Sequence, residues 1–174
     1  MGAERIILIV DDEDKVREAL SAVLLRDGYQ VLLAEDATEA LQILAEKNVH
    51  LVISDHHMPG MSGLQLLSLI RDRHPDVTRM MLSGDPDNHV VTRSIREGGV
   101  FWFLRKPWDN NVLRTTAYLA FQRRELEADN RRLSAACERQ AGFLEELATE
   151  SPALAPRLRE EADKLRAAQP EPRG

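Results

Sequence analysis

Three acidic residues follow the first strongly apolar stretch of the chain without a break. Residues 6–10, IILIV, run directly into Asp11, Asp12 and Glu13. Carboxylates this close repel one another, so a positive group is needed to compensate them. A single Asp after a strand is most often an ordinary loop or helix-cap residue. A functional site is indicated only if similar residues occur at similar places elsewhere in the chain.

Polar residues do recur at the ends of other apolar stretches. Asp55 follows HLVIS, Ser83 ends RMMLS, and Lys106 follows VFWFLR. Together with the first acidic residues they supply carboxylates, a hydroxyl and an amine. Clustered carboxylate oxygens suit a hard cation such as Mg²⁺, which accepts phosphate oxygens and waters at its remaining positions. The residue types therefore favour a magnesium-dependent site for phosphate chemistry.

These residues meet only if the fold brings the strand ends together. Strands are predicted at residues 5–10, 30–34, 50–54, 79–83 and 100–105. Helix-start signals lie between them, at Asp36, Ser62 and Asp85, the last followed by Pro86. Strands alternating with helices predict an α/β domain with a five-stranded, parallel, doubly wound sheet. Ligands of such sheets bind beyond the carboxyl ends of the strands, where the polar residues are expected.

Composition excludes several classes of protein. The chain has 174 residues, 43% of them hydrophobic, and a net charge of −6. This acidic balance argues against binding to DNA or to an anionic membrane. No apolar run approaches the length of a membrane span, and no signal peptide is recognisable. The single cysteine, Cys137, excludes an intramolecular disulfide and fits a reducing compartment. We expect a cytoplasmic protein.

Four motifs resemble one known family. VDDE, SDHHMPGMSG, LSG and FLRKPW occur in the order found in the phosphoacceptor receiver domains of bacterial two-component response regulators, each at a predicted strand end. The resemblance implies a flavodoxin-like receiver domain over residues 1–121. KPW followed by a long helix looks like the receivers that continue into a C-terminal coiled coil.

The resemblance implies a role for each motif residue. Asp55 would accept a phosphoryl group from a histidine kinase or a phosphotransfer protein. Asp12 and Asp55 would ligate Mg²⁺ with the main-chain carbonyl of His57, while Asp11 would act through a metal-bound water. Lys106 would pair with a phosphate oxygen.

Further roles concern the switch and the lifetime of the phosphoryl group. Ser83 would donate a hydrogen bond to the phosphate, and Phe103 would fill the space that Ser83 leaves. The alternative for Phe103 is an ordinary buried strand residue. His57 and Asp85 take positions that, in receivers, influence how water reaches the acyl phosphate. The bond between Lys106 and Pro107 is expected to be cis, as is frequent in the family.

The last third of the chain predicts a long helix over residues 109–150, with a short helix and a mobile tail over 151–174. Its apolar residues follow a heptad pattern. The predicted seam is Leu119, Leu126, Asn130, Leu133, Cys137, Leu144 and Leu147. This seam favours a parallel two-stranded coiled coil, in which the Cys137 thiols face each other. The alternative is a single amphipathic helix that folds against its own receiver.

The expected function is a response regulator in which phosphorylation switches a homodimeric coiled-coil output toward an unknown downstream protein. It would not be an enzyme with a separate catalytic domain. The alternative is the input part of a longer regulator whose output enzyme acts on a cyclic dinucleotide or a phosphoprotein. A hydrolase with an Asp nucleophile fits the acidic residues, but it would need a second substrate pocket or cap that a chain of this length does not supply.

Overall fold

The computed structural model describes residues 5–84 and 95–168. The chain divides into two compact units, Met1–Arg124 and Glu125–Gly174. The first unit contains the sheet and the residues of the predicted phosphate and magnesium site, and the second is helical. None of the described helices has the length and apolar character needed to span a membrane.

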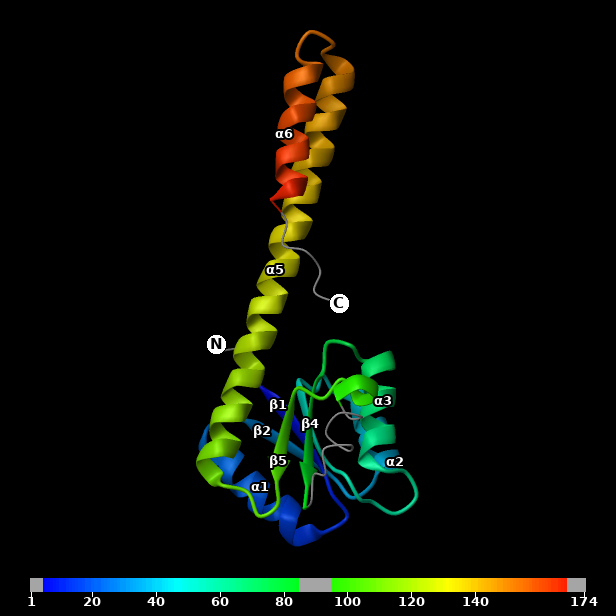
Figure 1. The fold of residues 1–174 in the computed structure, drawn as a ribbon, viewed down its shortest axis with the longest axis vertical. Helices are drawn as coiled ribbons and strands as arrows, with labels where there is room; N and C mark the ends of the chain where they lie inside the picture. The colour runs from blue at the N-terminus through cyan, green and yellow to red at the C-terminus, as the bar shows by residue number, and fades with distance from the viewer. Residues whose placement is uncertain (1–4, 85–94, 169–174) are drawn as a thin grey trace. The chain divides into compact units, whose positions relative to one another are not determined.

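The first unit is built on one five-stranded sheet (Figure 1). Its strands are β1 (Ile6–Val10), β2 (Gln30–Ala34), β3 (Leu51–Asp55), β4 (Thr78–Ser83) and β5 (Trp102–Arg105). Their order is β2-β1-β3-β4-β5, and every neighbouring pair is parallel. The predicted strands and the doubly wound fold are therefore confirmed. The carboxyl ends of β1, β3, β4 and β5 lie at one edge of the sheet.

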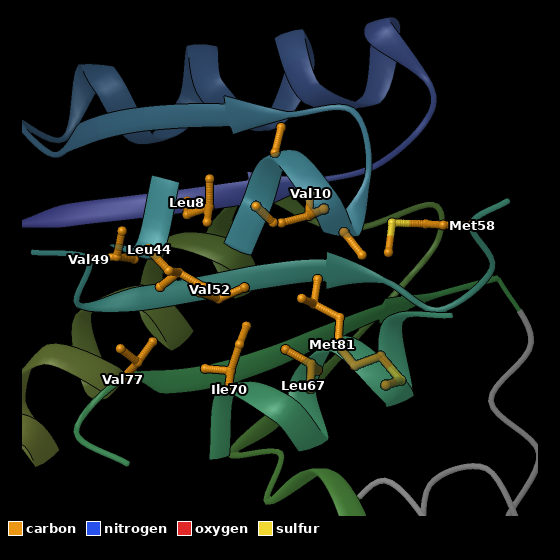
Figure 2. Packing of buried hydrophobic residues seen from close by; sticks show 14 of the residues in the cluster. Leu8, Val10, Leu44, Val49, Val52, Met58, Leu67, Ile70, Val77 and Met81 are labelled. Atoms are coloured by element: carbon orange, nitrogen blue, oxygen red, sulfur yellow. The ribbon is translucent and has the colours of Figure 1, made fainter. Parts of the chain in front are cut away.

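Helices cover both faces of the sheet. They are α1 (Asp14–Arg26), α2 (Ala37–Glu46), α3 (Gly63–Arg73) and the first part of α5 (Asn110–Glu150). The cluster that contains residues of α2 and α3 includes Leu8, Val52 and Met81 (Figure 2). The cluster that contains residues of α1 and α5 includes Ile9 and Ile53. Because alternate residues of one strand belong to opposite clusters, β1 is buried along its whole length.

Local side-chain bonds fix where the helices begin. Ser62 and Gln65 form the complete capping box that their spacing predicts. Asp36 accepts a hydrogen bond from the main-chain N–H of Glu39, as an N-cap does. Asp109 accepts bonds from two amides of the first turn of α5. Asp85, the other predicted cap, lies outside the described residues.

The second unit contains the last part of α5 and α6 (Ala155–Ala167). Four residues, 151–154, connect them, and α6 lies alongside α5 within this unit (Figure 1). Ala141 and Ala148 of α5 and Ala162 of α6 are buried. Arg166 forms ion pairs with Glu145 at 2.7 Å and Glu138 at 3.6 Å. The two helices thus form a hairpin.

Candidate phosphoacceptor site

One lysine links the carboxylates at the ends of two strands. The Nζ of Lys106 lies 2.7 Å from Oδ1 of Asp55 and 2.9 Å from Oδ2 of Asp11. Glu13 is more distant, at 3.7 Å. The main-chain N–H of Lys106 also donates to the carbonyl of Ser83. The structure therefore brings Asp11, Asp55, Ser83 and Lys106 together, and Lys106 supplies the positive charge that the acidic stretch requires.

Burial sets the protonation of this group. Asp11 is fully buried, and desolvation raises its pKa, although hydrogen bonds from Lys106 and from the N–H of Glu13 act in the opposite direction. For Lys106, desolvation alone would lower the pKa. Its bonds to Asp55 and Asp11 outweigh this effect and raise the pKa. Lys106 is therefore an ammonium at neutral pH, held between two buried carboxylates.

The donor set fits a magnesium ion in its chemistry. Asp11, Asp12 and Asp55 offer carboxylate oxygens, which Mg²⁺ prefers. Asp12 has an exposed side chain, unlike the other two. Within residues 5–84 and 95–168, no three acidic, His or Cys side chains are already arranged as a ligand set. Lys106 instead bridges two of the carboxylates, so a metal ion and this ammonium would compete for the same oxygens.

Ser83 has a buried hydroxyl with an unused hydrogen-bonding capacity. Ser83 is 1% exposed, and its Oγ has no hydrogen-bond partner among the residues that the structure describes. A buried hydroxyl without a partner is costly and uncommon, so a ligand oxygen is a reasonable missing acceptor. Phe103, the predicted switch aromatic, is partly buried against the sheet cluster. Its switching role stays a prediction, and Asp85 lies outside the described residues.

The loop after β3 binds the carboxylate oxygen of Asp55 that Lys106 does not contact. The main-chain N–H of His57 donates to Oδ2 of Asp55 at 2.7 Å, while the His57 side chain is exposed. Gly63 donates its N–H to the carbonyl of His56. A Cβ on Gly63 would lie 1.8 Å from the main-chain oxygen of Asp55. Only glycine allows α3 to begin this close to the carboxylate-bearing strand.

Two residues near the site escaped the sequence analysis. Gly63 is one: it ends the motif SDHHMPGMSG, but a close approach between the main chain of β3 and the start of α3 leaves no periodic signal that would assign it a role. Arg17 is the other: its guanidinium donates to the main-chain oxygen of Asp11 and to the carboxylate of Asp14. The spacing of Asp14 and Arg17 on a helix was the available clue. Arg17 therefore holds the carbonyl of the peptide that joins Asp11 to Asp12. The bond from Lys106 to Pro107 is cis, as expected.

Comparisons with known proteins agree with this geometry. The response regulator receiver domain family matches residues 7–118. The chain is 34% identical over 129 residues to the hydrogenase transcriptional regulatory protein HoxA of Bradyrhizobium diazoefficiens, and this match covers 74% of the chain and 26% of HoxA. It is 37% identical over 107 residues to the response regulator protein FleR of Pseudomonas aeruginosa, with 62% of the chain and 22% of FleR covered.

Solved structures give the same result. The signal receiver domain of an HD domain-containing protein from Pseudomonas fluorescens has a TM-score of 0.69 and 37% identity, covering 71% of this chain and 98% of that domain. The beryllofluoride-activated NtrC4 receiver domain dimer has a TM-score of 0.65 and 27% identity, with 68% and 98% covered. With its buried carboxylates, bridging lysine and parallel sheet, this chain belongs to the response regulator receiver domain family.

Proposed function

We propose that Asp55 accepts a phosphoryl group from a histidine kinase or a phosphotransfer protein in a magnesium-dependent reaction. The observation that carries this proposal is the position of Lys106, 2.7 Å from Asp55 and 2.9 Å from Asp11. An ammonium at this point can pair with the carboxylate before transfer and with a phosphoryl oxygen after it. Family membership supports the same assignment.

In the proposed step, an Oδ of Asp55 attacks phosphorus, and the bond between phosphorus and the donor nitrogen breaks. The imidazole of the donor leaves and takes up a proton. A bound Mg²⁺ would be held by Asp12, Asp55 and the main-chain carbonyl of His57, with Asp11 acting through a metal-bound water, and it would neutralise negative charge on the transferring oxygens. The main-chain N–H of His57 already bonds Oδ2 of Asp55 and leaves Oδ1 beside Lys106.

The product gives the buried hydroxyl a partner. An aspartyl phosphate adds strong acceptor oxygens and about −1.5 to −2 charge. Lys106 is expected to pair with one of these oxygens, and Ser83 to donate its unused hydrogen bond to another. The inward movement of Ser83 would leave space for Phe103, which is the proposed switch.

The test is the intact mass after treatment with a small phosphoryl donor and Mg²⁺. We expect a phosphate-sized gain in the wild type and none in Asp55→Ala. Ser83→Ala is the companion variant, because it should retain the acceptor carboxylate but lose the switch. A gain in Asp55→Ala would contradict the assignment, as would no gain in the wild type under conditions in which a known receiver reacts.

The exposed His57 side chain is proposed to tune the lifetime of the phosphoryl group. It lies next to the site, and its main-chain N–H is bonded to Asp55. Replacement by Ala keeps that N–H and removes only the imidazole. An unchanged rate of dephosphorylation in His57→Ala would refute this role.

We propose that the readout is a change in a homodimeric helical output that contacts a downstream protein in the cytoplasm. A second candidate is the input part of a longer regulator. It is favoured by the match to HoxA and FleR, which covers 26% and 22% of those proteins. The position of the gene's stop codon distinguishes the two.

A further inference from the structure

Within the second unit, α5 carries a seam of small and apolar residues that α6 covers. Its members follow one another at spacings of three and four, as in a coiled coil. They are Ser134, Cys137, Ala141, Leu144 and Ala148 of α5, followed by Ser151 at the start of the connection to α6. Ala141 is fully buried and Ala148 is 2% exposed, and the other four are partly buried. This set is called the covered seam.

The matching seam of α6 has the same spacing. Ala155, Leu158, Ala162 and Leu165 are the apolar members of α6 that are buried or partly buried. Arg166 reaches Glu138 and Glu145 at the edge of the covered seam. One side of α5 is thus occupied by a helix of the same chain.

A second seam on α5 stays open. It consists of Leu133, Ala136, Gln140, Phe143 and Leu147, again at spacings of three and four. Leu133 is 63% exposed and Phe143 is 61% exposed. Gln140 is exposed as well, whereas Ala136 and Leu147 are partly buried. Ala136, Gln140 and Phe143 also line a hollow of about 500 Å³, together with Arg139, Leu144 and Leu165. This set is called the open seam.

The hairpin needs a further cover. Its only buried residues among those described are three alanines, Ala141, Ala148 and Ala162. An assembly this small gains little from such a core and normally requires additional burial. A helix with two apolar seams is expected to have two neighbours, because each seam faces a different direction. The covered seam has its neighbour in α6, whereas Leu133, Gln140 and Phe143 of the open seam are exposed among the described residues.

The chemistry of the open seam fits a copy of itself. In a parallel pair, identical residues of a heptad seam meet across the axis. Gln140 suits this pairing because its amide both donates and accepts, so two copies can bond each other. The outward positions of α6 are charged, among them Glu160 and Lys164, which pair with one another. Contact through α5 is therefore favoured over contact through α6.

We propose that the open seam binds a second copy of this chain, with the two α5 helices parallel at the centre and each α6 on the outside. The inference deepens the proposed function and rests on it for the dimeric output. Cys137 and Leu144 then face α6, and Ala136 and Phe143 take their places in the interface. The native thiols do not meet across the axis.

Single cysteines at neighbouring positions of α5 provide the test, because a disulfide between two copies forms only where the two Cβ atoms approach closely. Ala136→Cys, Gln140→Cys and Ala135→Cys are each introduced into the Cys137→Ser chain and compared with the native Cys137. Mild oxidation is applied to the full chain with and without the phosphoryl donor. Disulfide dimers are expected at positions 136 and 140, and neither at 137 nor at the exposed control position 135.

Each other pattern overturns the proposal. Preferred crosslinking at 137 means that the covered seam forms the interface. Crosslinking at only one of 136 and 140 means an antiparallel pair, and none at all means that the seam does not bind a second copy. As a second measurement, Phe143→Glu should reduce the molar mass in solution from dimer to monomer, whereas Leu154→Glu, an exposed residue outside the seam, should not. A molar mass that Phe143→Glu leaves unchanged also refutes the proposal. The mass gain on Asp55 is read from the same samples, so failure of the dimer and failure of phosphorylation are distinguished.

Discussion

Replacing Lys106 with methionine should destabilise the first unit in a way that depends on pH. The substitution keeps a chain of similar length and removes the ammonium that bridges Asp11 and Asp55. The side chains of these carboxylates are only 1% and 8% exposed, so water does not replace the lost partner. Asp11 and Asp55 each keep one main-chain hydrogen bond, from Glu13 and His57 respectively.

The structure sets the expected size of the effect. Removing one partner of a buried ion pair costs about 3–5 kcal/mol. Because both carboxylates keep a main-chain donor, we expect the lower end, about 3 kcal/mol at pH 7 without Mg²⁺. Burial already raises the pKa of Asp11, and loss of Lys106 raises it further. Folded Lys106→Met then binds a proton more readily than its unfolded chain, so acidification relieves the cost, and the loss shrinks as the pH falls from 7 toward about 5.

The assay is urea unfolding in a metal chelator, followed by tryptophan fluorescence. Both tryptophans of the chain, Trp102 and Trp108, belong to the first unit, so the signal reports its unfolding. Lys15→Met is the matched control, since that lysine is exposed on α1 and should contribute little. Mg²⁺ should stabilise Lys106→Met more than the wild type, because the competing ammonium is gone. A loss below about 1 kcal/mol, or one that does not change with pH, would refute the assigned bridge.

Three further substitutions test neighbouring residues. Ser83→Ala should leave the free energy of unfolding unchanged within about 0.5 kcal/mol, because the hydroxyl has no hydrogen-bond partner among the described residues. A cost above about 1 kcal/mol would contradict this. Gly63→Ala should lower the free energy of unfolding by about 3 kcal/mol and slow phosphorylation, because the added Cβ would meet the main chain of β3. Gly142→Ala is the control: open space surrounds this position, so the substitution should stabilise α5 by about 1 kcal/mol. Arg17→Met should weaken Mg²⁺ binding measured by calorimetry, since the acidic turn after β1 loses a donor, while Arg26→Met should not; equal affinities in these two variants would exclude a positioning role for Arg17.

Much of the receiver fold follows from local sequence patterns. Short apolar runs with helix-start signals between them are sufficient for five parallel strands, and parallel strands bring their polar ends to one edge. The positions of Asp11, Asp55, Ser83 and Lys106 were predictable for this reason. Details that depend on distant contacts were not. The N–H of Phe101 bonds the carbonyl of Arg79, yet β5 begins only at Trp102, two residues later than the apolar run suggests.

The site itself shows the same division. The residue types of the motifs predict which side chains form the site. They do not predict which of these side chains pair with one another when no metal ion is bound. Lys106 pairs with both Asp11 and Asp55, while Asp12 stays exposed. This arrangement depends on how deeply each carboxylate is buried, which spacing along the chain does not encode. Burial makes the ammonium most favourable beside Asp11 and Asp55.

The helical unit shows how residue size can select between two possible interfaces. Heptad spacing along α5 identifies adjacent stripes equally well, one through Leu133, Gln140 and Leu147 and one through Ser134, Ala141 and Ala148. Small side chains allow two helices to approach closely, and α6 lies against the stripe that contains the alanines. Leu133 and Phe143 lie outside that stripe and stay exposed. Because a close pairing within the chain leaves the large residues free, the contact with α6 itself determines which side of α5 is available to a second copy.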